Sequence, residues 1–234
     1  MKLNSENRNV FVKNVFDQVF DKYDLMNDIM SLGIHRIWKN KLMDWMNPQL
    51  NENLIDVASG TGDIARLFSK KNNNSAQITC VEPNDEMRSA GKSNLENFKN
   101  IKWYKAKAEK LPFKNDTYDF YTISYGIRNV SDINLSLKEA LRVLKPGGRF
   151  MCLEFSKIDN EMINLLYQKY SKVIPFIGKY IVGSSEPYDY LIKSINEFYT
   201  QDELTNLIKK NGFSNVEYRN LSNGISAIHS GWKI

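Results

Sequence analysis

The stretch Leu54–Ala65, LIDVASGTGDIA, concentrates the residues of this sequence that can do chemistry. Its first part is apolar and strand-like but contains Asp56, and Gly60, Thr61 and Gly62 follow at once. Glycines let the backbone turn sharply and let a ligand approach closely. The helix expected to follow directs its free N–H groups into the same crevice. The pattern therefore predicts a ligand-binding turn that begins with Asp56.

The charges of this turn distinguish between two ligand classes. The residues also fit the loose dinucleotide pattern G-x-G-x-x-G/A, which would place a pyrophosphate at the helix N-terminus. Asp63 would then put a carboxylate beside that anion. S-adenosylmethionine carries an ammonium and a sulfonium and no phosphate, so Asp56 and Asp63 suit it better. An ordinary strand–turn–helix without a ligand is the remaining alternative.

Glu82 lies at the end of the next strand-like stretch, Gln77–Glu82. It follows the glycines by about 20 residues, the separation at which an acid accepts hydrogen bonds from ribose hydroxyls in nucleotide-binding folds. The alternative is a solvated acid at a strand end. The spacing favours the ribose role.

Apolar spacing predicts that strands and helices alternate over residues 54–155. The expected strands are Leu54–Ala58, Gln77–Glu82, Ile101–Lys105, Tyr118–Tyr125 and Arg149–Phe155, and the expected helices are Ile64–Lys70, Asp85–Leu95 and Ile133–Leu144. This alternation is typical of a parallel, doubly wound α/β sheet. A helix Gln201–Asn211 and two closing strands, Asn215–Leu221 and Ile225–Trp232, are expected after it. Strands joined this closely pair antiparallel.

Helical spacing dominates two further regions, and both are read as parts of one domain, 1–234. Apolar residues from 8 to 46 predict an N-terminal helical cap within 1–50. A second helical region, 158–199, forms an insertion before the last two strands. A chain of 234 residues is of a size usual for one domain.

The composition, 42% hydrophobic and 25% charged, is that of a globular protein, and no apolar run reaches the roughly 20 residues that span a bilayer. The start has no apolar signal core, so a cytoplasmic protein is expected. Cys80 and Cys152 are read as reduced core residues, and no metal site is predicted. Scattered lysines with a net charge of +5 argue against a nucleic-acid partner. They leave open a weak attraction to the inner membrane face.

Three longer segments resemble a known family. Tyr23–Trp38 reads YDLMNDIMSLGIHRIW, Ile123–Val130 reads ISYGIRNV, and Arg142–Ser156 reads RVLKPGGRFMCLEFS. Together with the glycine turn and the closing Leu221–Ile234, they resemble the quinone C-methyltransferases of ubiquinone and menaquinone biosynthesis, the UbiE family. The resemblance extends from about Phe16 to the C-terminus.

This resemblance implies a class I S-adenosylmethionine methyltransferase fold, Rossmann-like, with a seven-stranded, mostly parallel sheet and an antiparallel last strand. It implies C-methylation of a polyprenylated benzoquinol, of demethylmenaquinol, or of both. The cofactor residues carried over from the family are Thr61, Glu82, Lys107, Ala108 and Ser124, with Lys107 and Ala108 in a turn over the adenine. Ser59 stands where the family usually has glycine, and Glu82 where aspartate is frequent. The alternatives are another phenolic or lipid acceptor and a non-catalytic scaffold.

The implied chemistry needs a group that favours a phenolate, because a quinol hydroxyl ionises only near a pKa of about 10. Arg128 follows the carboxyl end of a predicted strand, where such folds bind ligands. A guanidinium stays protonated, so Arg128 is expected to stabilise the phenolate while a water carries the proton. Asn129 would hold the second ring oxygen. The alternative is that Arg128 pairs with an acid and fixes the loop.

His35 is the candidate general base, because its ordinary pKa lies near neutrality. Tyr23 belongs to the same segment, and both side chains have a structural alternative. We expect Tyr23–Trp38 to close the site and exclude water. The apolar insertion is expected to form a wall for the isoprenoid tail or an extra helical layer. A homodimer and peripheral contact with the membrane or with other quinone-pathway enzymes are left open.

Overall fold

The computed structural model describes residues 28–29, 31, 33–158, 161–162, 164–170 and 186–234. Tyr23, most of the N-terminal cap and the middle of the insertion, 171–185, lie outside the described residues. What the sequence predicts for them stays a prediction.

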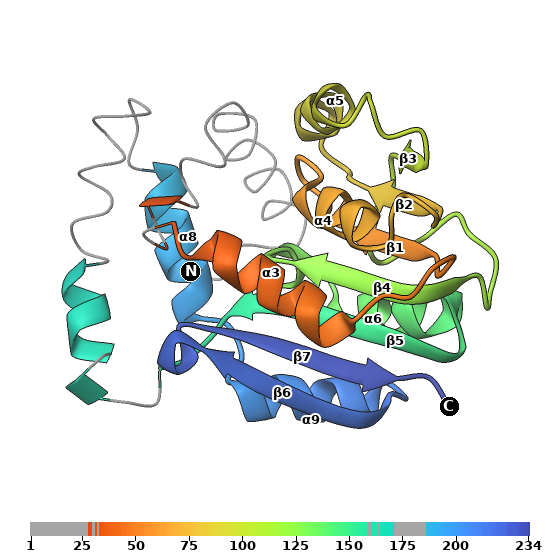
Figure 1. Ribbon diagram of the computed structural model, residues 1–234. Coiled ribbons are helices and arrows are strands. Elements are labelled where there is room, and N and C mark those ends of the chain that lie inside the picture. The colour runs from red at the N-terminus through yellow and green to blue at the C-terminus, as the bar shows by residue number, and fades with distance from the viewer. Residues whose placement is uncertain (1–27, 30, 32, 159–160, 163, 171–185) are drawn as a thin grey trace.

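Seven strands form one sheet in the order β3-β2-β1-β4-β5-β7-β6 (Figure 1). They are β1 Leu54–Val57, β2 Ile78–Val81, β3 Ile101–Tyr104, β4 Tyr118–Ser124, β5 Leu144–Phe155, β6 Ser214–Leu221 and β7 Ser226–Trp232. β7 runs antiparallel to both of its neighbours, β5 and β6, and the pairs from β3 to β5 are parallel. The predicted mostly parallel sheet with an antiparallel last strand is confirmed.

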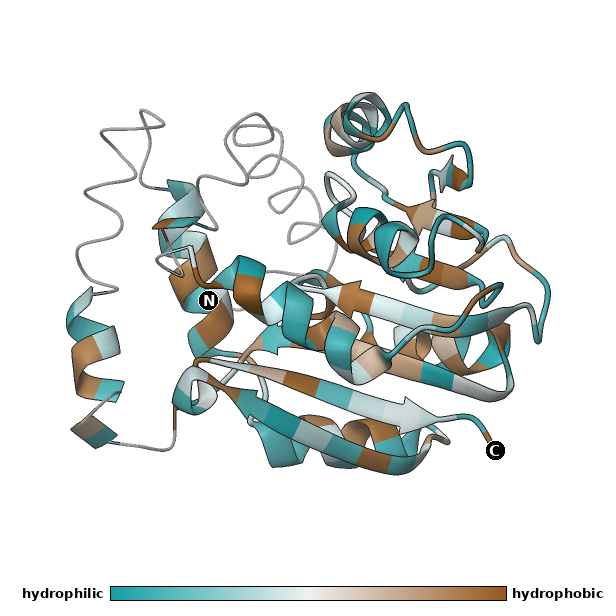
Figure 2. Ribbon diagram, in the orientation of Figure 1, coloured by the Kyte–Doolittle hydropathy of each residue, from teal (hydrophilic) through white to brown (hydrophobic). Residues whose placement is uncertain are grey.

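Helices cover both faces of the sheet. They are α3 His35–Met46, α4 Asp63–Lys71, α5 Asp85–Asn94, α6 Ile133–Val143, α8 Glu186–Asn196 and α9 Gln201–Lys210, with short 3-10 turns η2 Ile127–Asn129 and η3 Ser222–Gly224. Buried residues of α3 and α4 share one core cluster with one face of the sheet, and those of α6 and α9 share a second cluster on the other face. In Figure 2 the helices carry apolar residues interspersed with hydrophilic ones, as amphipathic helices do.

Side-chain caps explain where several helices begin. Asn84 accepts a hydrogen bond from the Met87 N–H at the start of α5, and Asp132 accepts one from the Leu135 N–H at the start of α6. A capping box of Thr200 and Glu203 begins α9.

Strand β5 begins earlier than expected. Leu144 already pairs with Tyr118, and Arg149 pairs with Phe120, so the residues between them bulge out of the ladder. Leu144 is completely buried, and this burial keeps it in the sheet. Gly147, at the tip of the bulge, has a φ of 79°, which a residue with a side chain seldom adopts.

The insertion is helical where the structure describes it, at 161–162, at 164–170 and in α8. Among the described residues, no helix combines the length and apolar character needed to cross a bilayer. Helix α8 contacts η2, the turn that follows β4. The insertion therefore reaches the carboxyl end of the parallel strands.

Candidate active site

The turn after β1 has the left-handed backbone that its glycines permit. Ala58, Gly60 and Gly62 have φ values of 53°, 56° and 90°. A Cβ atom on Gly62 would lie 2.5 Å from Leu95 Cδ1, so a side chain at this position would require Leu95 to shift and would also strain the backbone. Gly62 also precedes the first residue of α4.

Ser59, one of the two departures from the family pattern, connects the ends of two strands. Its Oγ donates to the Asp56 carbonyl oxygen at 2.6 Å and accepts from the Val81 N–H at 3.0 Å. Its own N–H donates to the Val81 carbonyl oxygen at 3.1 Å. The serine therefore joins the ends of β1 and β2, and a glycine at this position could make the N–H bond but neither of the two Oγ bonds.

Glu82 holds the glycine turn from the end of β2. One carboxylate oxygen accepts from the Gly60 N–H and the other from the Asn84 N–H, both at 2.9 Å. Burial raises the pKa of Glu82, and the two N–H groups act in the opposite direction. Each carboxylate oxygen has two lone pairs, so Glu82 retains acceptor sites for ribose hydroxyls.

The turn faces a small cavity that gathers residues from α3, β1, α4 and β4. Four predicted cofactor residues, Asp56, Gly60, Thr61 and Ser124, lie in its wall. The buried Ser124 hydroxyl has no hydrogen-bond partner among the described residues. The described residues of its lining are Lys39, Asp56, Ala58, Ser59, Gly60, Thr61, Ile64, Ser124 and Tyr125.

Asp56 offers this cavity an acceptor that the protein does not satisfy. Its Oδ1 accepts from the Thr122 hydroxyl at 2.7 Å, whereas Oδ2 is buried and has no partner among the described residues. Burial raises the pKa of Asp56 to about 7, against the hydrogen bond from Thr122. Buried acceptors are normally paired, so this oxygen indicates a ligand that brings a donor. The α-ammonium of S-adenosylmethionine is such a donor, and the residues present fit this cofactor.

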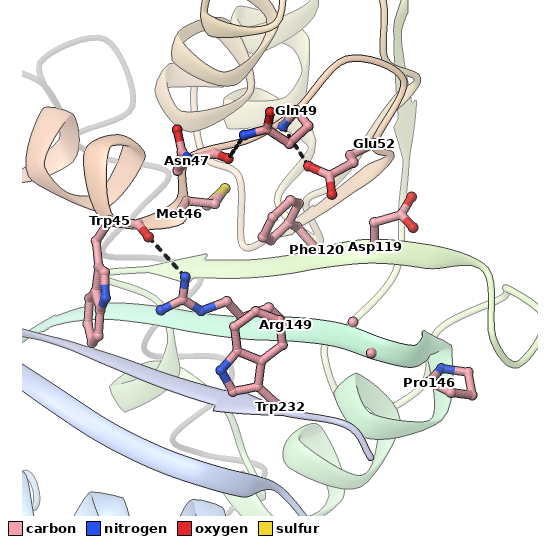
Figure 3. A pocket seen from close by; sticks show the side chains of 12 residues that line it. Trp45, Met46, Asn47, Gln49, Glu52, Asp119, Phe120, Pro146, Arg149 and Trp232 are labelled. Carbon is pink, nitrogen blue, oxygen red and sulfur yellow. Dashed lines mark hydrogen bonds between the residues drawn. The ribbon is translucent and has the colours of Figure 1, made fainter.

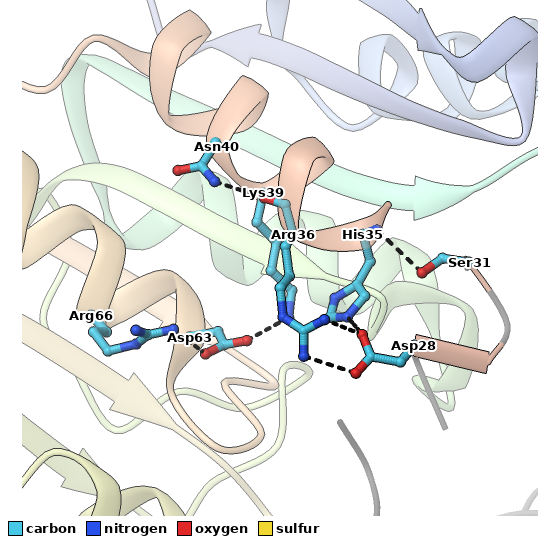
Figure 4. Close-up of polar contacts among 8 residues, drawn as sticks. All are labelled: Asp28, Ser31, His35, Arg36, Lys39, Asn40, Asp63 and Arg66. Carbon is cyan, nitrogen blue, oxygen red and sulfur yellow. Dashed lines mark hydrogen bonds and ion pairs between the residues drawn. The ribbon is translucent and has the colours of Figure 1, made fainter. Parts of the chain in front are cut away.

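Asp63 has a different role from the one that its position in the sequence suggests. It accepts from Lys39 Nζ at 2.7 Å and from an Arg66 guanidinium nitrogen at 2.9 Å (Figure 4). Burial acts to raise the pKa of Asp63, but the two cations outweigh it and lower that pKa to about 2. Because its charge is compensated, Asp63 does not by itself exclude a pyrophosphate, and the preference for a cationic ligand rests on Asp56.

Lys107 and Ala108 lie after β3 and do not line this cavity. Lys107 is exposed and its carbonyl oxygen accepts from the Lys110 N–H at 3.1 Å, whereas Ala108 is buried. The adjacent Glu109 accepts from the Ser131 N–H at 2.6 Å, which fastens this turn to the segment after η2. The adenine contact of Lys107 and Ala108 stays a prediction.

Arg128 is buried in an ion pair. Its NH1 lies 2.5 Å from Glu154 Oε1 and also donates to the Tyr125 carbonyl oxygen at 2.8 Å. Burial raises the pKa of Glu154, while Arg128 acts to lower it. The neighbouring Asn129 accepts from the Tyr190 hydroxyl of α8 at 2.9 Å. Both predicted residues therefore lie between the strand ends and the insertion.

His35 begins α3 and forms a pair with an acid. Its Nε2 lies 2.9 Å from Asp28 Oδ1, and Asp28 also binds Arg36 (Figure 4). The buried Nδ1 has no partner among the described residues. Burial lowers the pKa of His35, and Lys39, one helical turn away, lowers it further. A neutral ring that donates from Nε2 to Asp28 would keep a lone pair on Nδ1.

Two charged residues of this region, Lys39 and Glu154, are not picked out by the sequence reasoning. Lys39 lies within the buried stripe of α3, which comprises His35, Trp38, Lys39, Leu42, Met43 and Met46. Lys39 could have been found in the sequence as a charged residue at a position where the helical spacing predicts a buried apolar one. For Glu154 the signal was an acid within the otherwise apolar run Phe150–Phe155, which belongs to the fully buried part of β5.

A second cavity, at the opposite end of the strands, is lined by none of the predicted site residues that the structure describes (Figure 3). Arg149 lies between two indole rings there, with its guanidinium carbon 5.1 Å from the Trp45 ring centre and 4.8 Å from that of Trp232. It also donates to the Trp45 carbonyl oxygen at 2.9 Å. These contacts hold the end of α3 against the sheet.

Comparisons with known proteins agree with this geometry. Residues 1–233 match the model of the ubiE/COQ5 methyltransferase family. The chain belongs to this family. It is 49% identical over 240 residues to the ubiquinone/menaquinone biosynthesis C-methyltransferase UbiE of Rickettsia bellii strain OSU 85-389, covering 100% of this chain and 96% of the relative. The relative of the same name in Rickettsia prowazekii strain Madrid E is 49% identical over 230 residues, covering 95% and 92%.

The fold is shared with solved S-adenosylmethionine-dependent methyltransferases. One from Thermotoga maritima superposes with a TM-score of 0.68 at 20% identity, covering 94% of this chain and 99% of that structure. One from Aquifex aeolicus gives 0.62 at 16% identity, covering 84% and 89%. The expected family and fold class are confirmed, and S-adenosylmethionine is the cofactor of this ubiE/COQ5 family member.

Proposed function

We propose that this chain methylates a ring carbon of a polyprenylated benzoquinol, of demethylmenaquinol, or of both. The observation that carries the proposal is the similarity over nearly the whole chain to relatives named ubiquinone/menaquinone biosynthesis C-methyltransferase. The cavity supports it, because Asp56 and the glycine turn offer a cofactor site at the carboxyl end of β1. Arg128 and Asn129 follow the adjacent strand β4.

The bound cofactor supplies an activated methyl group, so the protein must align the acceptor and help to ionise it. His35 is the proposed base, with Nδ1 receiving the proton while Asp28 fixes the ring through Nε2. Arg128 is proposed to stabilise the phenolate, oriented by Glu154. Asn129 would position the second ring oxygen from a side chain that Tyr190 already orients. Alignment of the reacting groups supplies about 7–11 kcal/mol in the best model systems.

The isoprenoid tail is proposed to run along the insertion. A cavity between the described insertion segments is lined by Ser156, Lys157, Ile158, Asn164, Tyr167, Gln168, Ile192, Ile195 and Asn196. It adjoins the end of β5, two residues after the buried Glu154. Burial raises the pKa of Tyr167 to about 12, so its hydroxyl stays protonated and neutral in this wall.

The same insertion is proposed to contact the membrane that holds the substrate. Met162, Leu165 and Leu166 are 74%, 54% and 60% exposed, and their i, i+3, i+4 spacing places them on one helical face. An amphipathic helix with such a face lies in the membrane interface. Substituting these three residues by serine should weaken flotation with liposomes at low salt. Leu135→Ser, at a 48% exposed residue of α6, is the control and should float like the unchanged protein.

The function is tested by supplying the purified protein with labelled S-adenosylmethionine and a reduced polyprenylated demethylmenaquinol or benzoquinol. Mass spectrometry should find the added methyl group on a ring carbon. A product methylated on oxygen, or no product with either quinol while cofactor binding is intact, would contradict the proposal. The oxidised quinones serve as controls and should not react, because they lack an ionisable hydroxyl.

A further inference from the structure

Among the described residues, the wall of the cofactor cavity has one cationic and one anionic side chain. Lys39 comes from α3 and Asp56 from β1, and their exposed fractions are 7% and 1%. The methionine end of S-adenosylmethionine carries an α-carboxylate and an α-ammonium. We propose that Lys39 binds the α-carboxylate of the cofactor while Asp56 binds its α-ammonium. The inference concerns the cofactor and holds for any methyl acceptor.

Lys39 has donors available for such a contact. An ammonium group has three N–H donors. Among the described residues, the hydrogen-bond partner of Lys39 Nζ is Asp63 Oδ2, at 2.7 Å. The side chain nevertheless lines the cavity. A ligand carboxylate can therefore be added without breaking the pair with Asp63.

The local balance of charge also favours an anionic group beside Lys39. Asp63 is shared between Lys39 and Arg66, so two cations face one carboxylate there. Arg66 is 43% exposed and does not line the cavity, so Lys39 is the member of this pair of cations that a ligand in the cavity would meet. A ligand that brings an anionic group to Lys39 and a cationic group to Asp56 would match both charges of the wall.

The opposite wall presents the complementary group. Asp56 Oδ2 is buried without a partner in the described part of the chain, so it can accept from an ammonium. A buried charge is costly unless it is paired; Asp56 Oδ2 lacks a partner among the described residues, whereas Lys39 is paired with Asp63 and has further donors. One zwitterionic ligand would satisfy both residues at once. A neutral sugar or an adenine ring would satisfy neither charge.

The alternative role of Lys39 is purely structural, since its pair with Asp63 joins α3 to α4. Binding measurements with two ligands separate the roles. S-adenosylhomocysteine has the carboxylate, and its decarboxylated analogue, 5′-(3-aminopropylthio)adenosine, lacks it but keeps the ammonium. Titration calorimetry on the unchanged protein should show the analogue binding about 10- to 100-fold more weakly, the value of a hydrogen bond to a charged group.

The substitution Lys39→Met should remove this preference. The variant should lose about 10- to 100-fold in affinity for S-adenosylhomocysteine and less than about threefold for the analogue. Arg66→Met is the matched control, because it removes the other cation on Asp63 without touching the cavity. It should leave both affinities within about threefold of the unchanged protein.

Two results would overturn the proposal. Equal losses for both ligands in Lys39→Met would assign Lys39 to joining the helices alone. Equal affinity of the unchanged protein for the two ligands would remove the carboxylate contact, and this measurement needs no variant. Lys39→Arg keeps the positive charge and should retain a preference for S-adenosylhomocysteine.

Discussion

Arg128 and Glu154 form a buried ion pair, with side chains 4% and 2% exposed and a nitrogen–oxygen distance of 2.5 Å. The pair joins η2, which follows β4, to the end of β5. Removing one member leaves the other charge buried without its partner. Arg128→Met should therefore lower the free energy of unfolding by about 3–5 kcal/mol, measured by urea denaturation.

The double variant Arg128→Met/Glu154→Leu should recover most of that loss, because no uncompensated charge remains. It should still lack methyl transfer if Arg128 stabilises the phenolate. A stable and fully active double variant would contradict that catalytic role. A single Arg128→Met variant as stable as the unchanged protein would contradict the energetic importance of the pair.

His35→Asn tests the proposed base. Burial lowers the pKa of His35 below its ordinary value of 6.5. The ring therefore stays neutral, and able to accept a proton, at pH values down to that lowered pKa. Single-turnover rates of the unchanged enzyme should fall as the pH decreases through that lowered pKa. The variant should be slower by about 100-fold or more at neutral pH, as expected for loss of a general base. A variant that keeps both the rate and the acid limb would exclude His35 from proton transfer.

Gly62→Ala should destabilise the fold more than Gly147→Ala. Both positions have a left-handed backbone, with φ values of 90° and 79°, which costs an alanine about 1–2 kcal/mol. At Gly62 the added Cβ would also lie 2.5 Å from Leu95 Cδ1, whereas nothing lies within 4 Å of it at Gly147. Overpacking should add about 1–3 kcal/mol at Gly62. Equal urea midpoints for the two variants would contradict this steric effect.

His229 should make the fold sensitive to acid. Burial lowers its pKa to about 4, although its Nε2 hydrogen-bonds the Gln201 carbonyl oxygen at 2.9 Å. Between pH 6.5 and pH 4 the imidazole of His229 is protonated in the unfolded chain but stays neutral in the folded chain. Stability is therefore lost as the pH falls toward 4. The loss between pH 7 and pH 5 should be about 2 kcal/mol. His229→Gln should lose correspondingly less over the same interval; an identical loss would contradict the assignment.

Asp56 should release a proton when the cofactor binds. Burial raises its pKa to about 7, and an ammonium beside it would lower that pKa. Affinity for S-adenosylhomocysteine should therefore rise with pH up to and through about 7. At pH 6.5 the binding enthalpy should depend on the ionisation enthalpy of the buffer. Asp56→Asn should abolish that dependence, and a buffer-independent enthalpy in the unchanged protein would contradict the prediction.

The sequence by itself determined the order of strands and helices, the glycine turn and the family. These features depend on neighbours in the chain: period-2 and period-3.6 apolar spacing, and caps such as Asn84 and Thr200 beside the helices that they begin. The place of Glu82 was also predictable from the sequence, because it directly follows the strand-like stretch that became β2, about 20 residues after the glycines.

The partners of the charged residues were decided only by the tertiary structure. The sequence does not show that Asp63 pairs with Lys39 of α3, which is 24 residues away in the chain. Arg128 likewise pairs with Glu154, which is 26 residues away. Charge is compensated by neighbours in space, and sequence spacing does not report which side chains share a buried volume. The glycine turn thus specifies the proposed cofactor site, while the packing of α3 on α4 decides that Lys39 lines its cavity.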